Sequence, residues 1–234
     1  MSDLYIYKII NVLDAHPLHL KAHCDDLANY SAAIFGEYRE LDFRRIESAI
    51  ISKIEQYMPD VTLSIYAELR IYSDGREEIE LSSSIYRGYV LRAMPLVAAL
   101  VKYDLLMGEY PTLAQCAQAH LANIKVRREG AEVAIRESSE GLICSANGSP
   151  LFGVKGYTLY APHSVDSLER SLTISAAQSA GMDVVELDIR SEHLMFFDEL
   201  FYADHYGLTP IASLGERLYM SIMAEKIADQ MNQK

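Results

Sequence analysis

The stretch from Thr62 to Ser73 constrains the fold of this chain more than any other part of the sequence. Apolar side chains occupy alternate positions from Leu63 to Ile71, and mostly polar side chains stand between them. A period of two is expected for a β-strand in a sheet with one buried face. The Ser73-Asp74-Gly75 sequence that follows favours a turn, so the strand is predicted to end there.

The first half of the chain alternates between helix-like and strand-like periods. Apolar residues recur at helical spacing in residues 20–34, where Gly36 ends the pattern, and in residues 43–57, where Asp42 is suited to the N-cap. Further strand-like runs lie at residues 6–12, 78–81 and 89–96. Together these patterns predict an N-terminal α+β lobe over residues 1–106.

The polar and glycine-containing segment Met107–Pro111 is predicted to be a connector, and residues 112–234 a larger C-terminal lobe. A helical pattern from Leu113 ends at Gly130, and Ser164 or Ser167 is predicted to cap a second helix that ends at Gly181. A third helix is predicted near the C-terminus. Short strands are predicted at residues 133–135, 142–144, 151–154, 158–160 and 184–189.

Composition excludes several classes of function. Half of the residues are apolar, which is enough for a core, and the net charge of −12 opposes binding to nucleic acid or to anionic lipid. No secretion signal is recognisable, and no stretch approaches the roughly 18 apolar residues that a membrane span needs. Cys24, Cys116 and Cys144 are too widely spaced for a CxxC motif. We therefore expect a cytoplasmic protein.

The general catalytic motifs are absent from the sequence: it has no GxSxG, no phosphate-binding loop and no GxGxxG. The closest histidines are His16, His19 and His23, next to Asp25 and Asp26. His19 and His23 would share one face of a helix, as a metal site requires. However, His23 also falls on the apolar stripe, so a core histidine is favoured and no metal site is predicted.

Several short segments occur in a fixed order along nearly the whole chain. They are counterparts of the patterns HxxRL, LR, GADEALL…G.v.E.s.sNlF, TP…GITR and DE.F…G..PV, and in their order and spacing they resemble the class IV aminotransferases. That family includes branched-chain and D-amino-acid aminotransferases and aminodeoxychorismate lyase, and it binds pyridoxal phosphate (PLP). The matching segments are Val12–Asp14, His23–Leu27, Leu69–Ile71, Gly130–Ala134, Ser149–Phe152, Ala161-Pro162, Ser167–Arg170, Asp198–Phe201 and Gly207–Pro210.

The resemblance implies the two-lobed α+β architecture of PLP fold type IV. The N-terminal lobe would be an α/β sandwich, and the C-terminal lobe would combine a small barrel-like sheet with helices. Because subunits of this family usually pair through the small lobe, the resemblance also implies a homodimer.

The chain departs from the family where the family does its chemistry. The Schiff-base lysine of the pattern falls on Thr112, and the sequence has no lysine between Lys102 and Lys125. The glutamate that faces the pyridinium nitrogen falls on Ser145. Without an amine the cofactor aldehyde cannot be held covalently, and a neutral serine cannot keep the ring nitrogen protonated.

The expected phosphate site is altered in the same way. Asp26 takes the place of the arginine in HxxRL, and Glu169 takes the place of the threonine in GITR. Asp204 and His205 precede the final G..P pattern, where a small hydroxyl residue is usual. If these acids line the site, a phosphate dianion would meet like charge instead of a bidentate arginine.

The leading interpretation is a protein of this architecture that has lost PLP transamination, so that no cofactor is expected. The cleft between its lobes would bind a small molecule, and its acidity would suit a cationic or amine ligand. Any remaining reaction would be amino-acid chemistry of the aminotransferase or lyase type. The neighbours of this ligand would be Tyr66, Arg70, Tyr72 and His205.

Two alternatives remain open. In the first, the protein is a PLP enzyme that uses Lys8, which stands in the Tyr7-Lys8-Ile9 strand in place of the glutamate of the family's FET pattern. A solvent-facing lysine is favoured there, because lysine is seldom buried. In the second, the protein is a non-catalytic partner that dimerises with an active relative.

Overall fold

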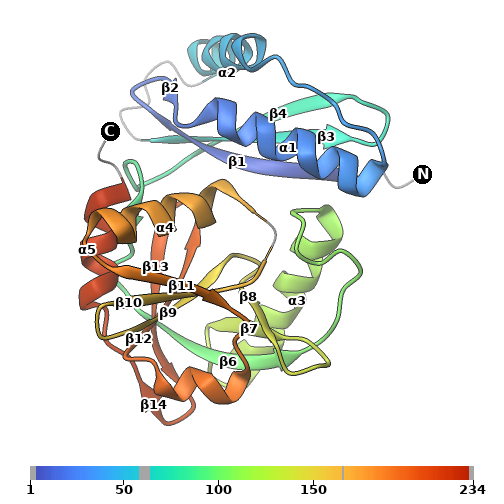
Figure 1. Ribbon diagram of the computed structural model, residues 1–234. Coiled ribbons are helices and arrows are strands. Elements are labelled where there is room, and N and C mark those ends of the chain that lie inside the picture. Colours follow the sequence, from blue (N-terminus) through green and yellow to red (C-terminus); the bar gives the residue numbers. More distant parts are fainter. Residues whose placement is uncertain (1–3, 58–63, 165, 232–234) are drawn as a thin grey trace. The chain divides into compact units, whose positions relative to one another are not determined.

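The computed structural model describes residues 4–57, 64–164 and 166–231 (Figure 1). The chain forms two compact units. The first comprises Met1–Gly88 with Tyr110–Leu113, and the second comprises Tyr89–Glu109 with Ala114–Lys234. Both units combine helices with strands, so the predicted α+β class is confirmed.

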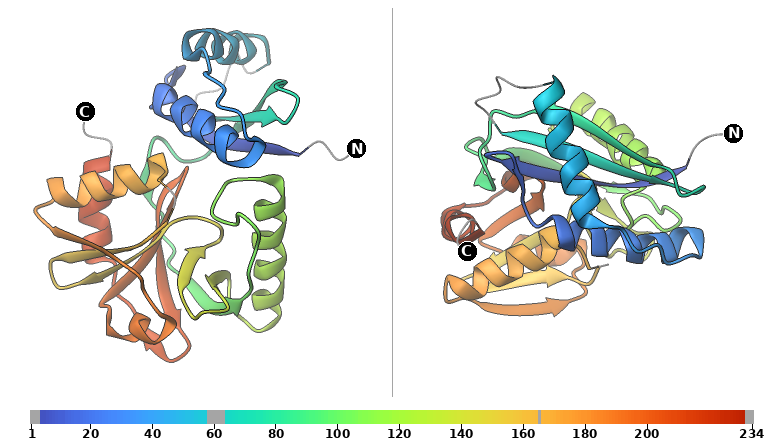
Figure 2. Two further views of the ribbon diagram at one scale, coloured as in Figure 1. Left: turned by 45° about the vertical axis from the view of Figure 1, so that its right-hand side comes forward. Right: turned by 90° about the horizontal axis from the view of Figure 1, so that it is seen from above.

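The first unit contains a four-stranded antiparallel sheet in the order β2-β1-β3-β4. The apolar face of this sheet includes Ile6, Ile10, Leu69 and Ile71, all of which are fully buried. Figure 2 shows both helices of the unit on one face of the sheet, as the alternating pattern of β3 requires. The elements are β1 (Tyr5–Leu13), β2 (His16–Pro17), α1 (Leu20–Phe35), α2 (Phe43–Tyr57), β3 (Ile65–Tyr72) and β4 (Glu77–Ser83). Residues 62 and 63 of the predicted strand lie outside the described residues.

Local signals set the ends of these helices. Gly36 ends α1 with a positive φ of 74°, a conformation that glycine adopts without steric cost. Asp42 precedes α2, and its Oδ1 accepts hydrogen bonds from the backbone N–H groups of Arg44 and Arg45 at 3.1 and 3.2 Å. Both predicted ends are therefore confirmed.

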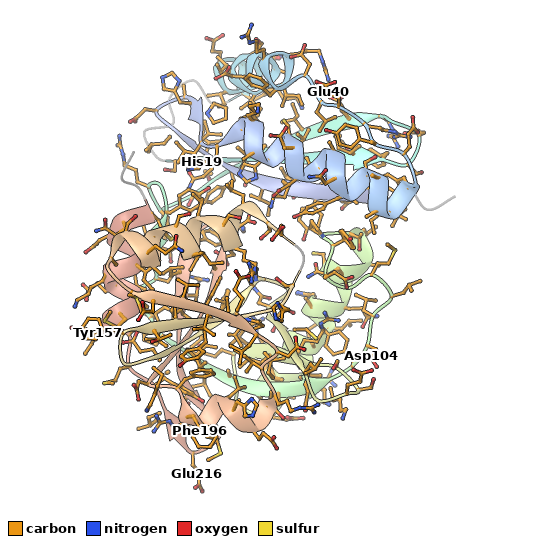
Figure 3. All side chains as sticks on the ribbon, viewed as in Figure 1. His19, Glu40, Asp104, Tyr157, Phe196 and Glu216 are labelled. Carbon is orange, nitrogen blue, oxygen red and sulfur yellow. The ribbon has the colours of Figure 1, made fainter. Side chains whose placement is uncertain are left out.

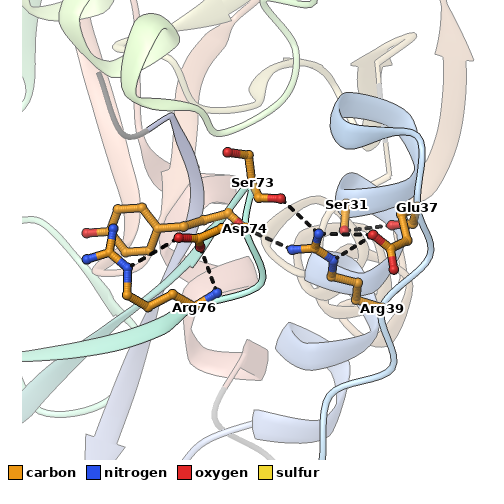
Figure 4. Close-up of polar contacts among 7 residues, drawn as sticks. Ser31, Glu37, Arg39, Ser73, Asp74 and Arg76 are labelled. Carbon is orange, nitrogen blue, oxygen red and sulfur yellow. Dashed lines mark hydrogen bonds and ion pairs between the residues drawn. The ribbon is translucent and has the colours of Figure 1, made fainter. Parts of the chain in front are cut away.

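Arg39, in the segment between the two helices, ties that segment to the β3–β4 turn (Figure 4). Its guanidinium donates to the backbone carbonyls of Tyr72 and Ser73 at 2.9 and 2.8 Å, and to the carboxylate of Glu37 at 3.0 Å. One planar fork thus satisfies acceptors from two distant parts of the chain.

The second unit is built on a ten-stranded, curled sheet in the order β11-β10-β9-β12-β13-β6-β7-β8, with β5 and β14 also paired to β13. Its helices are α3 (Leu113–Arg128), α4 (Leu168–Ser179) and α5 (Ile222–Met231), with a short 3₁₀ helix η1 (Ser191–Phe196). Its strands are β5 (Val90–Leu91), β6 (Leu96–Lys102), β7 (Val133–Glu137), β8 (Ile143–Ala146), β9 (Leu151–Lys155), β10 (Thr158–Pro162), β11 (Asp183–Leu187), β12 (Glu199–Asp204), β13 (Gly207–Leu214) and β14 (Arg217–Leu218).

Strand pairing decides which unit residues 89–109 belong to. From the sequence patterns, this segment is expected in the first lobe up to residue 106. In the structure β5 and β6 pair in parallel with β13, and β6 also pairs in parallel with β7, all within the second unit. The strand predicted at 89–96 is also two separate strands, β5 and β6, of which the second extends to Lys102.

Capping residues position the helices at one end of the second sheet. Ser167, rather than Ser164, caps α4 by accepting a hydrogen bond from the N–H of Arg170 at 3.3 Å. Glu199, which is 2% exposed, accepts from the N–H groups of Met223 and Ala224 in the first turn of α5 at 2.8 and 2.9 Å. A carboxylate at a helix N-terminus is favourable because it meets the unpaired donors and the positive end of the helix dipole.

Across residues 4–57, 64–164 and 166–231, no helix combines the length and the apolar character that crossing a bilayer demands.

Candidate functional site

Lys8 is buried, with 5% exposure, on the face of β1 that also carries Ile6 and Ile10. Its Nζ lies 3.0 Å from Oδ2 of Asp26 on α1. The alternation of β1 directs Lys8 toward the helix layer, and α1 packs on β1. The expectation that a solvent-facing lysine occupies this position is therefore wrong.

The Lys8–Asp26 ion pair alters the chemical role expected for each residue. The Asp26 carboxylate favours the protonated form of Lys8, and an ammonium has no lone pair with which to attack a carbonyl carbon. In turn, Lys8 compensates the charge of Asp26, which was expected among the acids that line the phosphate site. The patterns FET and HxxRL place a glutamate and an arginine at these positions, so the two charges are exchanged in this chain.

Thr112 lies beside the same strand. It forms an isolated antiparallel bridge with Ile6, and the N–H of Tyr7 donates to the carbonyl of Pro111 at 3.0 Å. Thr112 is 7% exposed and directly precedes α3. Within the first unit, Asp26 on α1 and Thr112 before α3 therefore both contact β1, at Lys8 and at Ile6 respectively.

Arg70 lies on the opposite face of that sheet, because its partner on β1 is Tyr7 whereas Lys8 is opposite Leu69. Its Nε donates to Glu68 at 2.6 Å and its Nη2 donates to Glu80 at 2.5 Å. The hydrogen bond to Glu68 raises the pKa of Arg70 further above its already high ordinary value. Arg70 is thus held by acids of its own sheet.

The two tyrosines predicted as ligand neighbours also make hydrogen bonds within the first unit. The hydroxyl of Tyr66 accepts a hydrogen bond from Ser84 Oγ at 2.9 Å, and the hydroxyl of Tyr72 donates to the Glu78 carboxylate. Both tyrosines share the face of Arg70, so the structure does not bring them to the Lys8–Asp26 pair.

A second group of predicted residues gathers in the second unit, where β12 turns into β13. Asp204 is the last residue of β12, and its Oδ1 accepts a hydrogen bond from the N–H of Tyr206 at 2.8 Å. The ring of His205 lies 4.1 Å from that of Tyr206 between centroids. Glu169, in the first turn of α4, acts electrostatically on both Asp204 and His205.

Burial dominates the protonation of this group. Burial raises the pKa of Asp204 to about 7, the nearby Glu169 charge adds to that rise, and the Tyr206 hydrogen bond and Arg92 oppose it. Burial also lowers the pKa of His205 to about 4, although Glu169 opposes this shift. At neutral pH His205 is therefore uncharged, and Asp204 is only partly ionised.

Arg92 belongs to this group and was missed by the sequence analysis. Its N–H donates to the carbonyl of Leu208 at 2.9 Å, and its guanidinium carbon lies 5.3 Å from the centroid of the Tyr206 ring. Its charge acts on Asp204 and on His205. The group is thus less anionic than the sequence suggested, and no local pattern could have revealed this because β5 meets β13 only through tertiary pairing.

Ser145 lies on β8 with 8% exposure, and it is directly opposite Arg136 on β7. A bulge follows Arg136, and the Asn147-Gly148 turn, with φ values of 51° and 77°, leads from β8 toward β9. Gln115 of α3 holds this turn by donating to the carbonyl of Gly148 at 2.8 Å. Arg136 was also missed, although a single cation within an apolar strand is a recognisable signal.

The position of His23 bears on the metal site that the sequence spacing raised. His23 is 1% exposed within the first unit, as the apolar stripe predicted. No set of three or more histidine, cysteine or acidic side chains suited to a metal ion occurs in the part of the chain that the structure describes.

A groove of about 460 Å³ is found beside the start of α1 and the start of α2. His19, Lys21, Asp25 and Glu47 contribute polar groups to its wall, and Lys21 lies 3.6 Å from Asp25. Burial lowers the pKa of His19. The groove contains none of the residues to which the family patterns assign chemistry.

Comparisons with known proteins give a consistent result. Neither a family model nor a curated protein matches the chain. A branched-chain aminotransferase from Thermoproteus uzoniensis, solved with norvaline, is similar in structure with a TM-score of 0.82 and 19% identity, over 98% of this chain and 84% of that one. A putative 4-amino-4-deoxychorismate lyase from Legionella pneumophila has a TM-score of 0.80 and 18% identity, over 98% and 90%.

A third solved structure, a hypothetical aminotransferase from Mycobacterium tuberculosis, has a TM-score of 0.82 and 16% identity, over 99% of this chain and 91% of that one. Similarity at these identities establishes the fold and leaves the chemistry to the residues. The chain has the fold of the fold-type IV transaminases and aminodeoxychorismate lyase-like proteins.

Proposed function

We propose that this protein is a small-molecule-binding relative of the class IV aminotransferases that does not carry out lysine-dependent PLP transamination. The observation that carries the proposal is that no unpaired amine stands where the family chemistry needs one. The position of the family lysine is a buried threonine, Thr112, and the one buried lysine among the described residues, Lys8, is paired with Asp26.

The residues present do not fit PLP at the positions that the family patterns give. Thr112 offers a hydroxyl where an amine is needed, and Ser145 offers no carboxylate for a pyridinium. Glu169 and Asp204 supply acids near the expected phosphate site. No reaction step is therefore assigned to PLP in this chain.

The Glu169–Asp204–His205 group supports an amine as the ligand. An ammonium would donate charge-assisted hydrogen bonds to the Asp204 and Glu169 carboxylates, and the uncharged His205 would not repel it. Arg92 would limit the selectivity for cations, because it already compensates part of the acidic charge.

Calorimetric titration with n-butylamine, and with n-butanol as the neutral analogue, tests this assignment. We expect the amine to bind and the alcohol to bind at least about tenfold more weakly, a difference of about 1.4 kcal/mol. Glu169→Gln and Asp204→Asn should each weaken binding of the amine. Glu216→Gln is the matched control, because Glu216 is an exposed acid on the turn after β13 (Figure 3). Equal binding of amine and alcohol would refute a cation site.

A PLP enzyme that uses Lys8 is the second candidate. The burial of Lys8 favours it, because desolvation is a route to a nucleophilic lysine. The Asp26 carboxylate at 3.0 Å opposes it, since it stabilises the charged form. Asp26→Asn would relieve that effect, so a visible imine absorbance with added PLP that strengthens in Asp26→Asn would support the second candidate over the first.

A further inference from the structure

Arg136 is a partly buried cation without an acidic partner. Its Nε is fully buried and makes no hydrogen bond, and no carboxylate of the described residues lies within ion-pair distance of its guanidinium. Two other arginines each have a hydrogen-bond acceptor for the guanidinium, a carbonyl in one case and a carboxylate in the other. Arg217 also has a buried Nε but donates through Nη2 to the carbonyl of Phe197 at 2.6 Å, and the buried Arg170 donates to Glu186 at 2.5 Å.

The surroundings of Arg136 supply further polar groups. Ser145 is its direct partner across β7 and β8, so the two side chains project from the same face about 5 Å apart at Cβ. The guanidinium carbon lies 5.8 Å from the centroid of the Tyr103 ring. Gly108 leaves room for the guanidinium, because a Cβ there would come within 2.8 Å of Nη1 of Arg136.

The charge of Arg136 acts on two neighbouring titratable groups, Cys144 and Asp104. Burial raises the pKa of the Cys144 thiol, and the Arg136 charge opposes that rise. Hydrogen bonds from Ser139 lower the pKa of Asp104, and Arg136 adds to this effect. Asp104 and Glu109 also act on Cys144, so two acids lie in the outer surroundings of the site.

We infer that Arg136 and Ser145 form a binding site for a small carboxylate. The planar guanidinium can donate two parallel hydrogen bonds to a carboxylate, and the Ser145 hydroxyl can donate a third. A monoanion is the matching charge. A phosphate dianion carries two negative charges, more than the single charge of Arg136 balances, and Asp104 and Glu109 would repel it.

The family patterns agree with a change of charge here. The register of GADEALL puts its second leucine on Arg136, and the later glutamate falls on Ser145. The leucine of the pattern is thus replaced by the cation Arg136, and the glutamate is replaced by the neutral Ser145. The inference uses none of the residues of the proposed amine site, so it holds or fails independently of amine binding.

Titration of the full-length protein with sodium acetate, at ionic strength held constant with chloride, tests the inference. The readout is the side-chain Nε–H resonance of Arg136, followed by nuclear magnetic resonance and assigned with Arg136→Lys. We expect a saturable shift with a Kd on the order of 1 mM. Inorganic phosphate in a parallel titration should bind more weakly than acetate.

Variants separate Arg136 from general charge effects. Arg136→Lys keeps the charge but loses the planar fork, so acetate binding should weaken about tenfold. Arg136→Leu carries the residue of the family pattern and should fold, as the thermal unfolding midpoint can verify, but not bind. Arg128→Leu removes an exposed arginine of α3 and should bind acetate like the unchanged protein.

Three outcomes would overturn the inference. The first is the absence of a saturable shift at Arg136 across the millimolar range. The second is calorimetric acetate binding that persists unchanged in folded Arg136→Leu. The third is phosphate binding tighter than acetate binding, which would reject a carboxylate as the ligand.

Discussion

Lys8 and Asp26 show how one contact decides between two interpretations of the same residues. Taken alone, Lys8 is a candidate nucleophile and Asp26 an added negative charge. At 3.0 Å from each other they form a pair between β1 and α1, so each compensates the other. The sequence could not reveal this, because the pairing depends on how α1 lies over the sheet.

Breaking this pair should destabilise the first unit. Lys8→Glu places two carboxylates together in a largely buried position, so we expect the free energy of unfolding to fall by about 3 kcal/mol. Adding Asp26→Arg restores opposite charges in the arrangement of the family patterns and should recover most of that loss. Urea denaturation of the single and double variants measures both values. A double variant no more stable than Lys8→Glu would contradict a direct ion pair.

Asp204 and His205 should give opposite pH dependences of stability. The folded-state pKa of Asp204 is raised to about 7, so the folded state binds more protons than the unfolded one and stability falls as pH rises from about 4 to 7. The folded-state pKa of His205 is lowered to about 4, so stability rises between about pH 4 and 6.5.

In the unchanged protein the two pH dependences of stability oppose each other, and single variants should separate them. Asp204→Asn leaves the His205 effect, so its urea midpoint should rise with pH over this window. His205→Gln leaves the Asp204 effect, so its midpoint should fall. Slopes of the same sign in the two variants would show that burial does not control these groups.

Amine binding has its own pH dependence at this site. Ionised Asp204 attracts an ammonium and protonated Asp204 does not, so the affinity for n-butylamine should increase as pH rises through about 7. Calorimetry in two buffers with different ionisation enthalpies should detect release of a proton on binding near pH 7. A flat affinity between pH 6 and 8 would remove Asp204 from the amine site.

Among the elements, α5 depends on a single buried side chain. Glu199→Ala removes the acceptor of two backbone N–H groups in its first turn, and we expect a loss of about 2 kcal/mol in the free energy of unfolding. Glu216→Ala, on the exposed turn before β14, should stay within about 0.5 kcal/mol of the unchanged protein. Equal effects of the two changes would mean that the cap contributes nothing.

Elements with local signals were predictable, and elements defined by distant partners were not. Gly36 and Asp42 marked helix ends that the structure confirms, and Ser167 was one of two proposed caps. In contrast, β6 was assigned to the wrong lobe. Its partners β13 and β7 are parallel, and strands in parallel sheets lack the alternation that revealed β3.

On the scale of the whole molecule, the fold-type IV architecture was predictable because many weak segments kept their order along the chain. The candidate site was predictable only as a set of positions. Thr112, Asp26 and Lys8 belong to the first unit, whereas Ser145, Glu169 and Asp204 belong to the second. The charge balance of the residues in the second unit depended on Arg92 and Arg136, which no segment of the resemblance had singled out.

The most direct test asks whether any lysine of this protein forms an imine with PLP. The protein is treated with borohydride in the presence of PLP, and the modified peptides are mapped by mass spectrometry. Exposed lysines such as Lys102 serve as the internal measure of non-specific labelling. We expect the peptide containing Lys8 to gain no more cofactor mass than these do, and Thr112→Lys to gain a new modified site at residue 112. Stoichiometric labelling of Lys8 in the unchanged protein would show instead that this lysine is a working Schiff-base amine.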